Sequence, residues 1–322
     1  MRLKRKLHNV YYGIDAAPHD LILSLKRKFR FAARYSVKYD RKEAALYDNV
    51  IQSHSMNDIL FFTFADWKYH VFAALYPVFA LTTNDNSCVE ICLSEFDLFM
   101  ENYRNIIDFY NQVYPGRVFY RSVKVSDIFP NSVRFLLKPE MTAKYVYIGD
   151  VDILLLERNI EDYHIEFMKK YDSDFSNVLR NENQLTGLHF MEYEKMYPVK
   201  IPRGADLLSM NDEVLLCSMM REKQCKFPPL GIPLSERKTH GMHISMLSRP
   251  PLRTLTTHDR QVNFPAWTIS PNAAKYLEIR YSTPVVEFMQ CISENQIKLR
   301  QVIQTADMFA YYRLKEQNYS DD

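Results

Sequence analysis

Two carboxylates, Asp150 and Asp152, stand one residue apart inside an apolar stretch, KYVYIGDVDILLLE (144–157). Gly149 ends the first apolar run, and a second run begins at Ile153. Leaving two acids unpaired in a partly buried cleft would be costly. A divalent cation removes that cost, because Mg²⁺ and Mn²⁺ take oxygen ligands and leave positions for substrate phosphates. We therefore interpret the pair as a metal site. The alternative is a solvated turn between two strands, with both acids pointing to water.

The elements that must position these acids alternate between strand-like and helix-like segments. Strands are expected at 57–67, 88–95, 116–124 and 145–156 (strand, turn, strand), helices at 69–83 and 96–114, and helical or mixed structure at 128–137. This order predicts an α/β fold with a mixed, mostly parallel sheet flanked by helices. Ligands of such sheets bind beyond the carboxyl ends of the strands, so Asp66, Asp150 and Asp152 are expected to face one crevice.

The second half of the chain gives weaker patterns. We expect a helix at 166–171, a strand leading to a turn at 186–198, a helix at 211–224 capped by Asn211 or Asp212, and a loop at 226–251. Residues 271–317 are helical in pattern apart from a break at Pro284, and should pack outside the sheet. The predicted domains are a basic arm (1–56), a catalytic domain (57–268) and a C-terminal helical extension (269–322).

Composition narrows the class of protein. The chain has 322 residues, 47% of them hydrophobic, and five cysteines without regular spacing. This pattern argues against a disulfide framework, so we expect reduced core thiols and a cytoplasmic protein. No apolar run approaches the roughly 18 residues that a membrane span needs. The basic first residues lack the apolar stretch of a signal peptide.

Charge is distributed unevenly along the chain. Residues 1–44 hold 12 Lys and Arg against four acids, although the net charge of the whole chain is only +2. Apolar and basic residues interleave in LILSLKRKFRFAARYSVKY (21–39), which suits an anionic membrane surface. A solvated basic helix on the domain edge is the interpretation that we favour slightly. Nucleic acid is a weaker third option, because no recognition motif accompanies the charge, and we expect no nucleic-acid partner.

The D-x-D at the end of an apolar strand resembles that of the metal-dependent glycosyltransferases of the GT-A fold, which is Rossmann-like. FADWKY (64–69) resembles the A-D-x-x-Y nucleotide-binding segment of glycosyltransferase family 8, which includes glycogenin and the lipopolysaccharide galactosyl- and glucosyltransferases. RFLLKPEMTAKYVYIGDVD (134–152) is similar to the stretch that leads into the D-x-D of that family, and NDE (211–213) to its D-Q-D segment.

Two further segments match the family in part. HISMLSRPP (243–251) keeps the spacing of a late H-x-x-G-x-x-K-P-W element, with Met246, Arg249 and Pro251 in place of the Gly, Lys and Trp. LTGLHF (185–190) shares only its Gly with the N-S-G segment of the family. The resemblance covers roughly residues 57 to 251.

The resemblance implies roles for individual residues. Asp66 and Tyr69 would hold the nucleoside, with the Tyr ring stacked on the base, and Thr63, Ala65, Val151 and Arg134 would lie near the donor. Asp150 would reach the ribose and the metal, Asp152 would bind the metal, and His243 would be a third protein ligand. His240 competes with His243, but the spacing to Arg249 favours His243. Arg249 would clamp the diphosphate. Asp212 and His189 are the catalytic candidates, each also open to a structural interpretation.

The implied reaction is transfer of a hexose from a nucleotide sugar, expected to be a UDP-sugar, to a glycan or a lipid-linked saccharide. The implied cofactor is Mn²⁺ or Mg²⁺, and family 8 enzymes retain the anomeric configuration. Such a chain would build bacterial surface polysaccharide on the cytoplasmic face of the membrane, contacting it through residues 1–44. Two alternatives stay open: a phosphatase of the haloacid dehalogenase type, and a non-catalytic carbohydrate- or membrane-binding scaffold.

Overall fold

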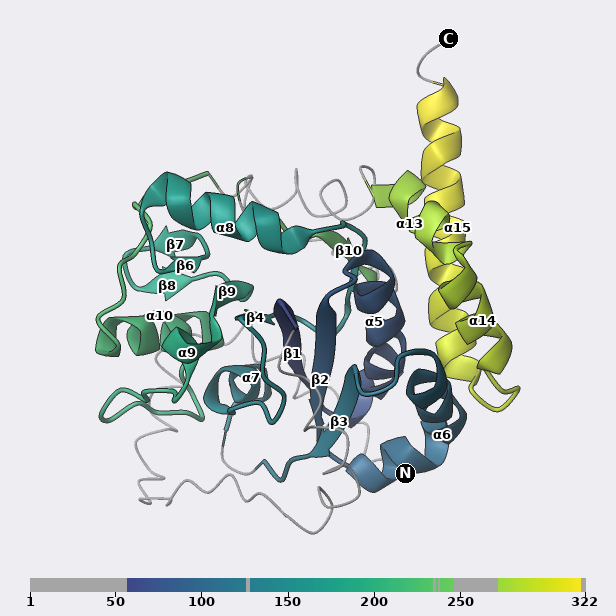
Figure 1. Cartoon of the computed structure of the whole chain (residues 1–322), viewed down its shortest axis with the longest axis horizontal. Helices are drawn as coiled ribbons and strands as arrows, with labels where there is room; N and C mark the ends of the chain where they lie inside the picture. The colour runs from purple at the N-terminus through teal and green to yellow at the C-terminus, as the bar shows by residue number, and fades with distance from the viewer. Residues whose placement is uncertain (1–56, 126–127, 234–235, 237, 246–271, 320–322) are drawn as a thin grey trace, which may run out of the picture. The chain divides into compact units, whose positions relative to one another are not determined.

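The computed structural model describes residues 57–125, 128–233, 236, 238–245 and 272–319 (Figure 1). The predicted basic arm and Arg249 lie outside these residues. Six strands form the main sheet, in the order β3-β2-β1-β4-β9-β6. They are β1 (Ile59–Ala65), β2 (Ser87–Leu93), β3 (Val118–Ser122), β4 (Tyr145–Ile148), β6 (Phe175–Ser176) and β9 (His189–Glu192). The first four pair in parallel, whereas β9 pairs antiparallel with both β4 and β6.

Helices cover both faces of this sheet (Figure 1). Strands β1 and β2 are buried along almost their whole length, as expected of strands with both faces covered. One face packs against α5 (His70–Thr83) and α6 (Phe96–Val113). The other packs against α7 (Val133–Leu136), α9 (Tyr193–Met196) and α10 (Asp212–Glu222). The prediction of a mixed, mostly parallel α/β sheet flanked by helices is therefore confirmed.

The order in which strands are added to the sheet reverses between β1 and β4, which remain parallel. Strands β2 and β3 add to one side of β1, and the chain then returns to place β4 on its other side. Such a reversal leaves a crevice at the carboxyl ends of the two central strands. The Thr63 hydroxyl donates a 2.8 Å hydrogen bond across it to the Gly149 carbonyl oxygen, which ties the ends of β1 and β4 together.

A short antiparallel pair corrects the prediction of a continuous loop at 226–251. Strand β10 (Gly241–His243) pairs with β5 (Ile153–Leu155), which directly follows the two acids. A strand of three residues carries too little periodicity to be recognised in a sequence; it exists because β5 offers a partner. Helix α8 (Ile160–Tyr171) begins earlier than predicted, and a hairpin of β7 (Leu179–Asn181) and β8 (Gln184–Leu185) was not predicted.

The C-terminal helices form a further layer outside the sheet. They are α13 (Ala273–Arg280), α14 (Thr283–Cys291) and α15 (Ile297–Tyr319). Helix α14 packs on α5 and α6, and α13 packs on α15. Pro284 lies in the first turn of α14, where its missing N–H costs nothing, so the helical pattern breaks before it. No helix in the described part of the chain is both long and apolar enough to cross a membrane.

The five cysteines are all free. Cys88, Cys92 and Cys217 are buried, whereas Cys225 and Cys291 are only partly buried. The prediction of core thiols therefore holds for three of the five.

Candidate functional site

Asp150 and Asp152 lie in the tight turn that joins β4 to β5, at the carboxyl end of the central strand. Asp152 is 4% exposed, and its Oδ2 accepts hydrogen bonds from His243 Nε2 at 3.0 Å and from the Ser245 hydroxyl. Asp150 is more exposed, and its Oδ1 pairs with Arg134 Nη1. These contacts use one oxygen of each carboxylate. Within the described residues, the pair is therefore a partnered cluster and not a solvated turn.

Arg134 connects this turn to a second acid. It comes from the second position of α7, and its Nη2 lies 3.3 Å from Asp212 Oδ2 and 3.4 Å from the Gly187 carbonyl oxygen. Asp212 opens α10, where the Asn211 side chain caps the helix by accepting from the backbone N–H groups of the next turn. One guanidinium thus bridges Asp150 and Asp212, which the sequence places far apart.

Burial and charge act against each other on these groups. Burial alone would lower the pKa of Arg134, but Asp150 and Asp212 outweigh it and raise that pKa. Burial likewise opposes ionisation of Asp152, yet His243 and Ser245 hold the pKa of this carboxyl below its usual value. Burial raises the pKa of Asp212 in spite of Arg134. Asp152 and Asp212 therefore differ: the surroundings of Asp152 favour its ionised form, whereas those of Asp212 favour protonation.

His243 and His240 face different partners. His243 ends β10 opposite Ile153 and contacts Asp152, whereas His240 is 2% exposed and has both ring nitrogens in other bonds. Its Nδ1 lies 2.7 Å from Glu157 Oε2, and its Nε2 lies 3.1 Å from His164 Nε2. The structure thus places His243, and not His240, in contact with Asp152.

The segment after β1 differs from the arrangement that the resemblance implies. The Asp66 side chain caps the turn η2 (Trp67–Tyr69) by accepting from the Lys68 N–H at 2.9 Å. The Tyr69 ring packs on Phe72, with 5.5 Å between ring centroids. Trp67 is 55% exposed, and Lys68 Nζ lies 5.9 Å from the centroid of its ring.

Several other predicted residues are structural in this fold. Thr63 ties β1 to β4, and Ala65 and Val151 are almost completely buried. His189 on β9 is 0% exposed, its Nδ1 lies 3.4 Å from the Asn177 side-chain nitrogen, and its Nε2 has no hydrogen-bond partner within the described structure. Burial lowers the pKa of His189 to about 3. A neutral, sealed imidazole does not favour the catalytic role that we predicted for it.

The site offers carboxylate oxygens and one imidazole as possible ligands for a divalent cation. Within the described ranges, no group of three or more His, Cys, Asp or Glu side chains is arranged to hold a metal ion. Asp152 and His243 supply two such side chains in direct contact, and Asp150 is held by Arg134. Mg²⁺ in phosphate-binding sites is commonly bound by one or two carboxylates together with substrate phosphates and water. The donor types present fit that chemistry when a phosphate completes the set.

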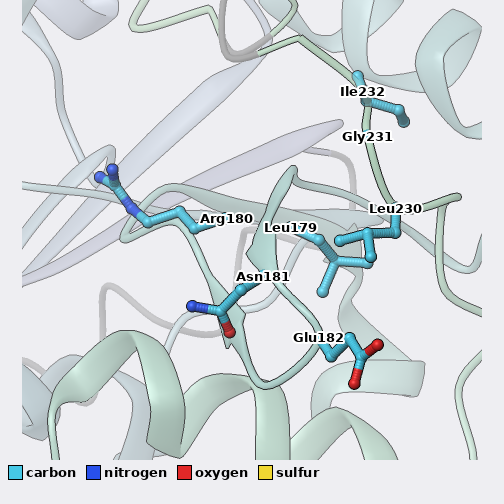
Figure 2. Close-up of a pocket in the computed structure, with 7 residues that line it drawn as sticks. All are labelled: Leu179, Arg180, Asn181, Glu182, Leu230, Gly231 and Ile232. Atoms are coloured by element: carbon cyan, nitrogen blue, oxygen red, sulfur yellow. The ribbon is translucent and has the colours of Figure 1, made fainter. Parts of the chain in front are cut away.

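A separate pocket of about 420 Å³ lies between the β7–β8 hairpin and the segment 230–232 (Figure 2). It is lined by Leu179, Arg180, Asn181, Glu182, Leu230, Gly231 and Ile232. In Figure 2 the side chain of Arg180 points away from Leu230. Arg180 Nε lies 2.8 Å from Glu213 Oε2, and Glu213 Oε1 accepts from the Gly187 N–H at 3.1 Å. Because Gly187 also contacts Arg134, the pocket is linked to the acidic cluster.

No protein-family model matches the chain, and no curated protein does. Among solved structures, it is similar to the glycosyltransferase GlyE of Streptococcus pneumoniae, with 12% identity over 44% of this chain and 35% of that one (TM-score 0.33). It is also similar to the galactosyltransferase LgtC, solved with donor and acceptor sugar analogues, with 11% identity over 52% of this chain and 65% of that one (TM-score 0.29). The match to TarS of S. aureus has 10% identity over 79% of this chain and 54% of that one (TM-score 0.33).

In each case the chain matches less than two thirds of the solved protein, and only about a third of GlyE. All three TM-scores lie below 0.5, so neither the fold nor the activity of this chain is inferred from these likenesses.

Proposed function

We propose that the chain is a GT-A-type glycosyltransferase that takes a hexose from a UDP-sugar and passes it to a carbohydrate acceptor. One observation carries the proposal. Asp150 and Asp152, from the D-x-D, meet Arg134, Asp212 and His243 at the carboxyl end of the central strand, where α/β sheets bind their ligands. These residues come from the segments that carry the family resemblance.

The charge of the cluster supports a metal-dependent donor site. Among the described residues, Asp150, Asp152 and Asp212 bring three carboxylates against the one guanidinium of Arg134. A diphosphate approaching this surplus of negative charge would be repelled unless a cation lies between them. Mn²⁺ or Mg²⁺, held by Asp152 and His243 with the diphosphate completing the set, would supply that charge and polarise the leaving diphosphate. The donor set contains oxygen and imidazole nitrogen, which both ions accept.

The residues of the chain then have separable tasks. Glycosyl transfer breaks the bond between the anomeric carbon and a diphosphate oxygen and forms one to an acceptor hydroxyl, whose proton leaves with the diphosphate. Arg134 orients Asp150, and Ser245 with His243 keeps Asp152 ionised. Asp212, the acid whose pKa burial raises, would lie near the transferred sugar. Following the family resemblance, we propose that the anomeric configuration is retained.

We place the acceptor in the pocket beside the β7–β8 hairpin. Its volume of about 420 Å³ is within the range of about 300–1,000 Å³ that is typical of small-molecule sites. Leu179 and Leu230 offer an apolar wall for a sugar ring, and Glu182 offers a hydrogen-bond acceptor for hydroxyls. The acceptor would be a glycan or lipid-linked saccharide of a bacterial surface polysaccharide, on the cytoplasmic face of the membrane, with residues 1–44 as the membrane contact.

Thermal stability tests the proposal directly. The melting temperature is measured with Mn²⁺, UDP and GDP, alone and combined, for the wild type and for Asp152→Asn. A ligand that binds only the native state raises the melting temperature by mass action. We expect a rise with UDP that requires Mn²⁺ and is lost in Asp152→Asn, while the exposed control Asp97→Asn keeps it. The absence of any nucleotide response in the wild type would refute the donor site.

A further inference from the structure

A row of hydrogen-bonded side chains lies beside the candidate site and takes no part in it; Ser176, His164 and His240 are buried, Glu157 is partly buried and Lys275 is exposed. The Ser176 hydroxyl lies 2.8 Å from His164 Nδ1, and His164 Nε2 lies 3.1 Å from His240 Nε2. His240 Nδ1 lies 2.7 Å from Glu157 Oε2, and Lys275 Nζ lies 3.1 Å from Glu157 Oε1. These residues come from β6, α8, the approach to β10, the end of β5 and α13, so the row joins five separate segments.

The direction of every hydrogen bond in the row follows from its carboxylate end. An ionised carboxylate only accepts, so the proton on His240 is at Nδ1, and a neutral His240 then accepts at Nε2. His164 must therefore donate from Nε2, and its Nδ1 accepts from the Ser176 hydroxyl. The two histidines are thereby fixed in opposite tautomers. A second proton on His240 would place two N–H donors opposite each other between the two rings. A second proton on His164 would prevent its Nδ1 from accepting the Ser176 hydroxyl.

His240 also bonds through its backbone to the segment that follows β5. The His240 carbonyl oxygen accepts from the backbone N–H groups of Leu156 at 2.7 Å and Glu157 at 3.2 Å. His240 has φ of +55°, a left-handed conformation that non-glycine residues adopt only where surrounding contacts impose it. Three residues later, His243 reaches Asp152, and the Ile244 N–H donates to the Asp152 carbonyl oxygen at 2.9 Å.

We propose that His240 and His164 are positioning residues: by holding His240 on Glu157, the row fixes β10 against β5 and keeps His243 on Asp152. This inference rests on the proposed function only where it assigns the Asp152–His243 contact to the donor site. The other charged or titratable side chains that face the two rings are Lys275, Lys238, Tyr163, Tyr147 and His189. Glu157 is the one carboxylate among the described groups that bonds to either ring, and it sets the direction of the row.

Nitrogen-15 histidine spectra of the full chain test the proton arrangement without any ligand. At pH 7.5 we expect His240 protonated at Nδ1 only and His164 at Nε2 only, with resonances assigned from single substitutions. A charged ring, or the same tautomer at both positions, would overturn the inference. Ser176→Ala removes the hydroxyl that bonds to His164 Nδ1 and leaves both rings in place. It should therefore shift the His164 Nδ1 signal more than any His240 signal.

Two isosteric substitutions then test positioning. In His240→Asn the amide nitrogen takes the place of Nδ1 and can still donate to Glu157, whereas in His240→Gln it takes the place of Nε2 and cannot. We expect the His243 signal that reports its bond to Asp152 to persist in His240→Asn and to be lost in His240→Gln. UDP affinity in the presence of Mn²⁺ should fall about tenfold in the Gln variant relative to the Asn variant, as for loss of a buried hydrogen bond.

The outcomes of the two proposals are separable. If wild-type protein binds no UDP with Mn²⁺, the proposed function fails, while the His243 signal still decides the positioning role. If both substitutions leave the His243 signal unchanged, the positioning role fails even when UDP binds. If His240→Gln does not fold, Glu157→Gln replaces it: the row then loses its charged end, and the tautomer order of the two histidines should no longer be fixed.

Discussion

His243 Nε2 lies 3.0 Å from Asp152 Oδ2, although the two residues are 91 positions apart in the chain. Strands β5 and β10 bring them together, and Ser245 adds a second donor to the same carboxylate oxygen. A neutral or charged imidazole can make this contact, and a divalent cation accepts both side chains as ligands.

His243→Ala removes one side of the pair. Asp152 then keeps only the Ser245 bond, and the proposed cation loses a protein ligand. We expect the affinity for UDP in the presence of Mn²⁺ to fall at least about tenfold, comparable to loss of a group that orients or completes a metal site. Isothermal titration with Mn²⁺–UDP measures it. Ser245→Ala is the matched comparison and should have the smaller effect; equal affinities for wild type and His243→Ala would remove His243 from the site.

Arg134→Met leaves Asp150 and Asp212 without their shared cation. Breaking a buried ion pair by removing one partner leaves an uncompensated charge, so the free energy of unfolding should drop by roughly 3 kcal/mol. Urea denaturation gives the value. Arg158 pairs with Glu278 at 3.8 Å, and both are about 70% exposed, so Arg158→Met should be neutral. Similar losses in the two variants would mean that Arg134 contributes only packing.

His189 makes the stability depend on pH in a defined direction. Its folded pKa of about 3 lies below the usual value, so between about pH 6.5 and 3 the unfolded state takes up a proton that the native state does not. Stability is therefore full above about pH 6.5 and declines as the pH falls, by about 1.4 kcal/mol per pH unit from this group. In His189→Leu, the loss between pH 7.5 and 5 should be about 2 kcal/mol smaller. Groups common to both proteins cancel in the comparison, and identical losses would contradict it.

Gly241→Ala should force β10 away from β5. A Cβ at this position would lie 1.7 Å from the Leu154 carbonyl oxygen, which no side-chain movement relieves. The Leu156 amide, which donates to the His240 carbonyl oxygen, should lose its protection from hydrogen exchange. Gly204→Ala is the control, because its φ is +76° with open space around it; it should cost about 1 kcal/mol of left-handed strain and leave the Leu156 amide protected. Retained protection in Gly241→Ala would show that the strand pair tolerates the change.

The pocket beside the β7–β8 hairpin predicts a split between donor and acceptor binding. Leu230→Ala removes part of its apolar wall, so the acceptor KM in a UDP-hexose transfer assay should rise about tenfold, while the UDP-induced rise in melting temperature is unchanged. Leu98 on α6 is similarly exposed and lies outside the pocket, so Leu98→Ala serves as the control. An unchanged acceptor KM in Leu230→Ala would move the acceptor elsewhere.

Much of the central fold could be predicted because its signals are local. The runs that form β1 and β4 are apolar for as long as a buried strand requires, and α6 has a clear apolar stripe. The position of Asp150 and Asp152 at a strand end follows from the same patterns. Glu90 shows where local signals fail: it stands in the middle of β2 yet is fully buried, because Arg121 and the N–H groups of Glu140 and Met141 reach it from elsewhere in the chain.

The site was only partly predictable for the same reason. Arg134 bridges two acids that approach it from β4 and α10, and no spacing in the sequence encodes that meeting. The choice between His240 and His243 depended on a three-residue strand whose existence requires β5. Tyr69 matched the family letter, and the sequence alone did not show that its ring packs against Phe72.

The pairing of β5 with β10 also gives the chain a recognisable sequence signature. The strand after D-x-D and the segment H-G-x-H contact each other directly. Gly241 faces the Leu154 backbone, His240 contacts Glu157, and His243 contacts Asp152. A change in one segment therefore has to be matched by the other. Chains that share this architecture should therefore keep or lose the two segments together. A glycine flanked by these two histidines, far downstream of the paired acids, would distinguish such relatives where overall identity is too low to do so.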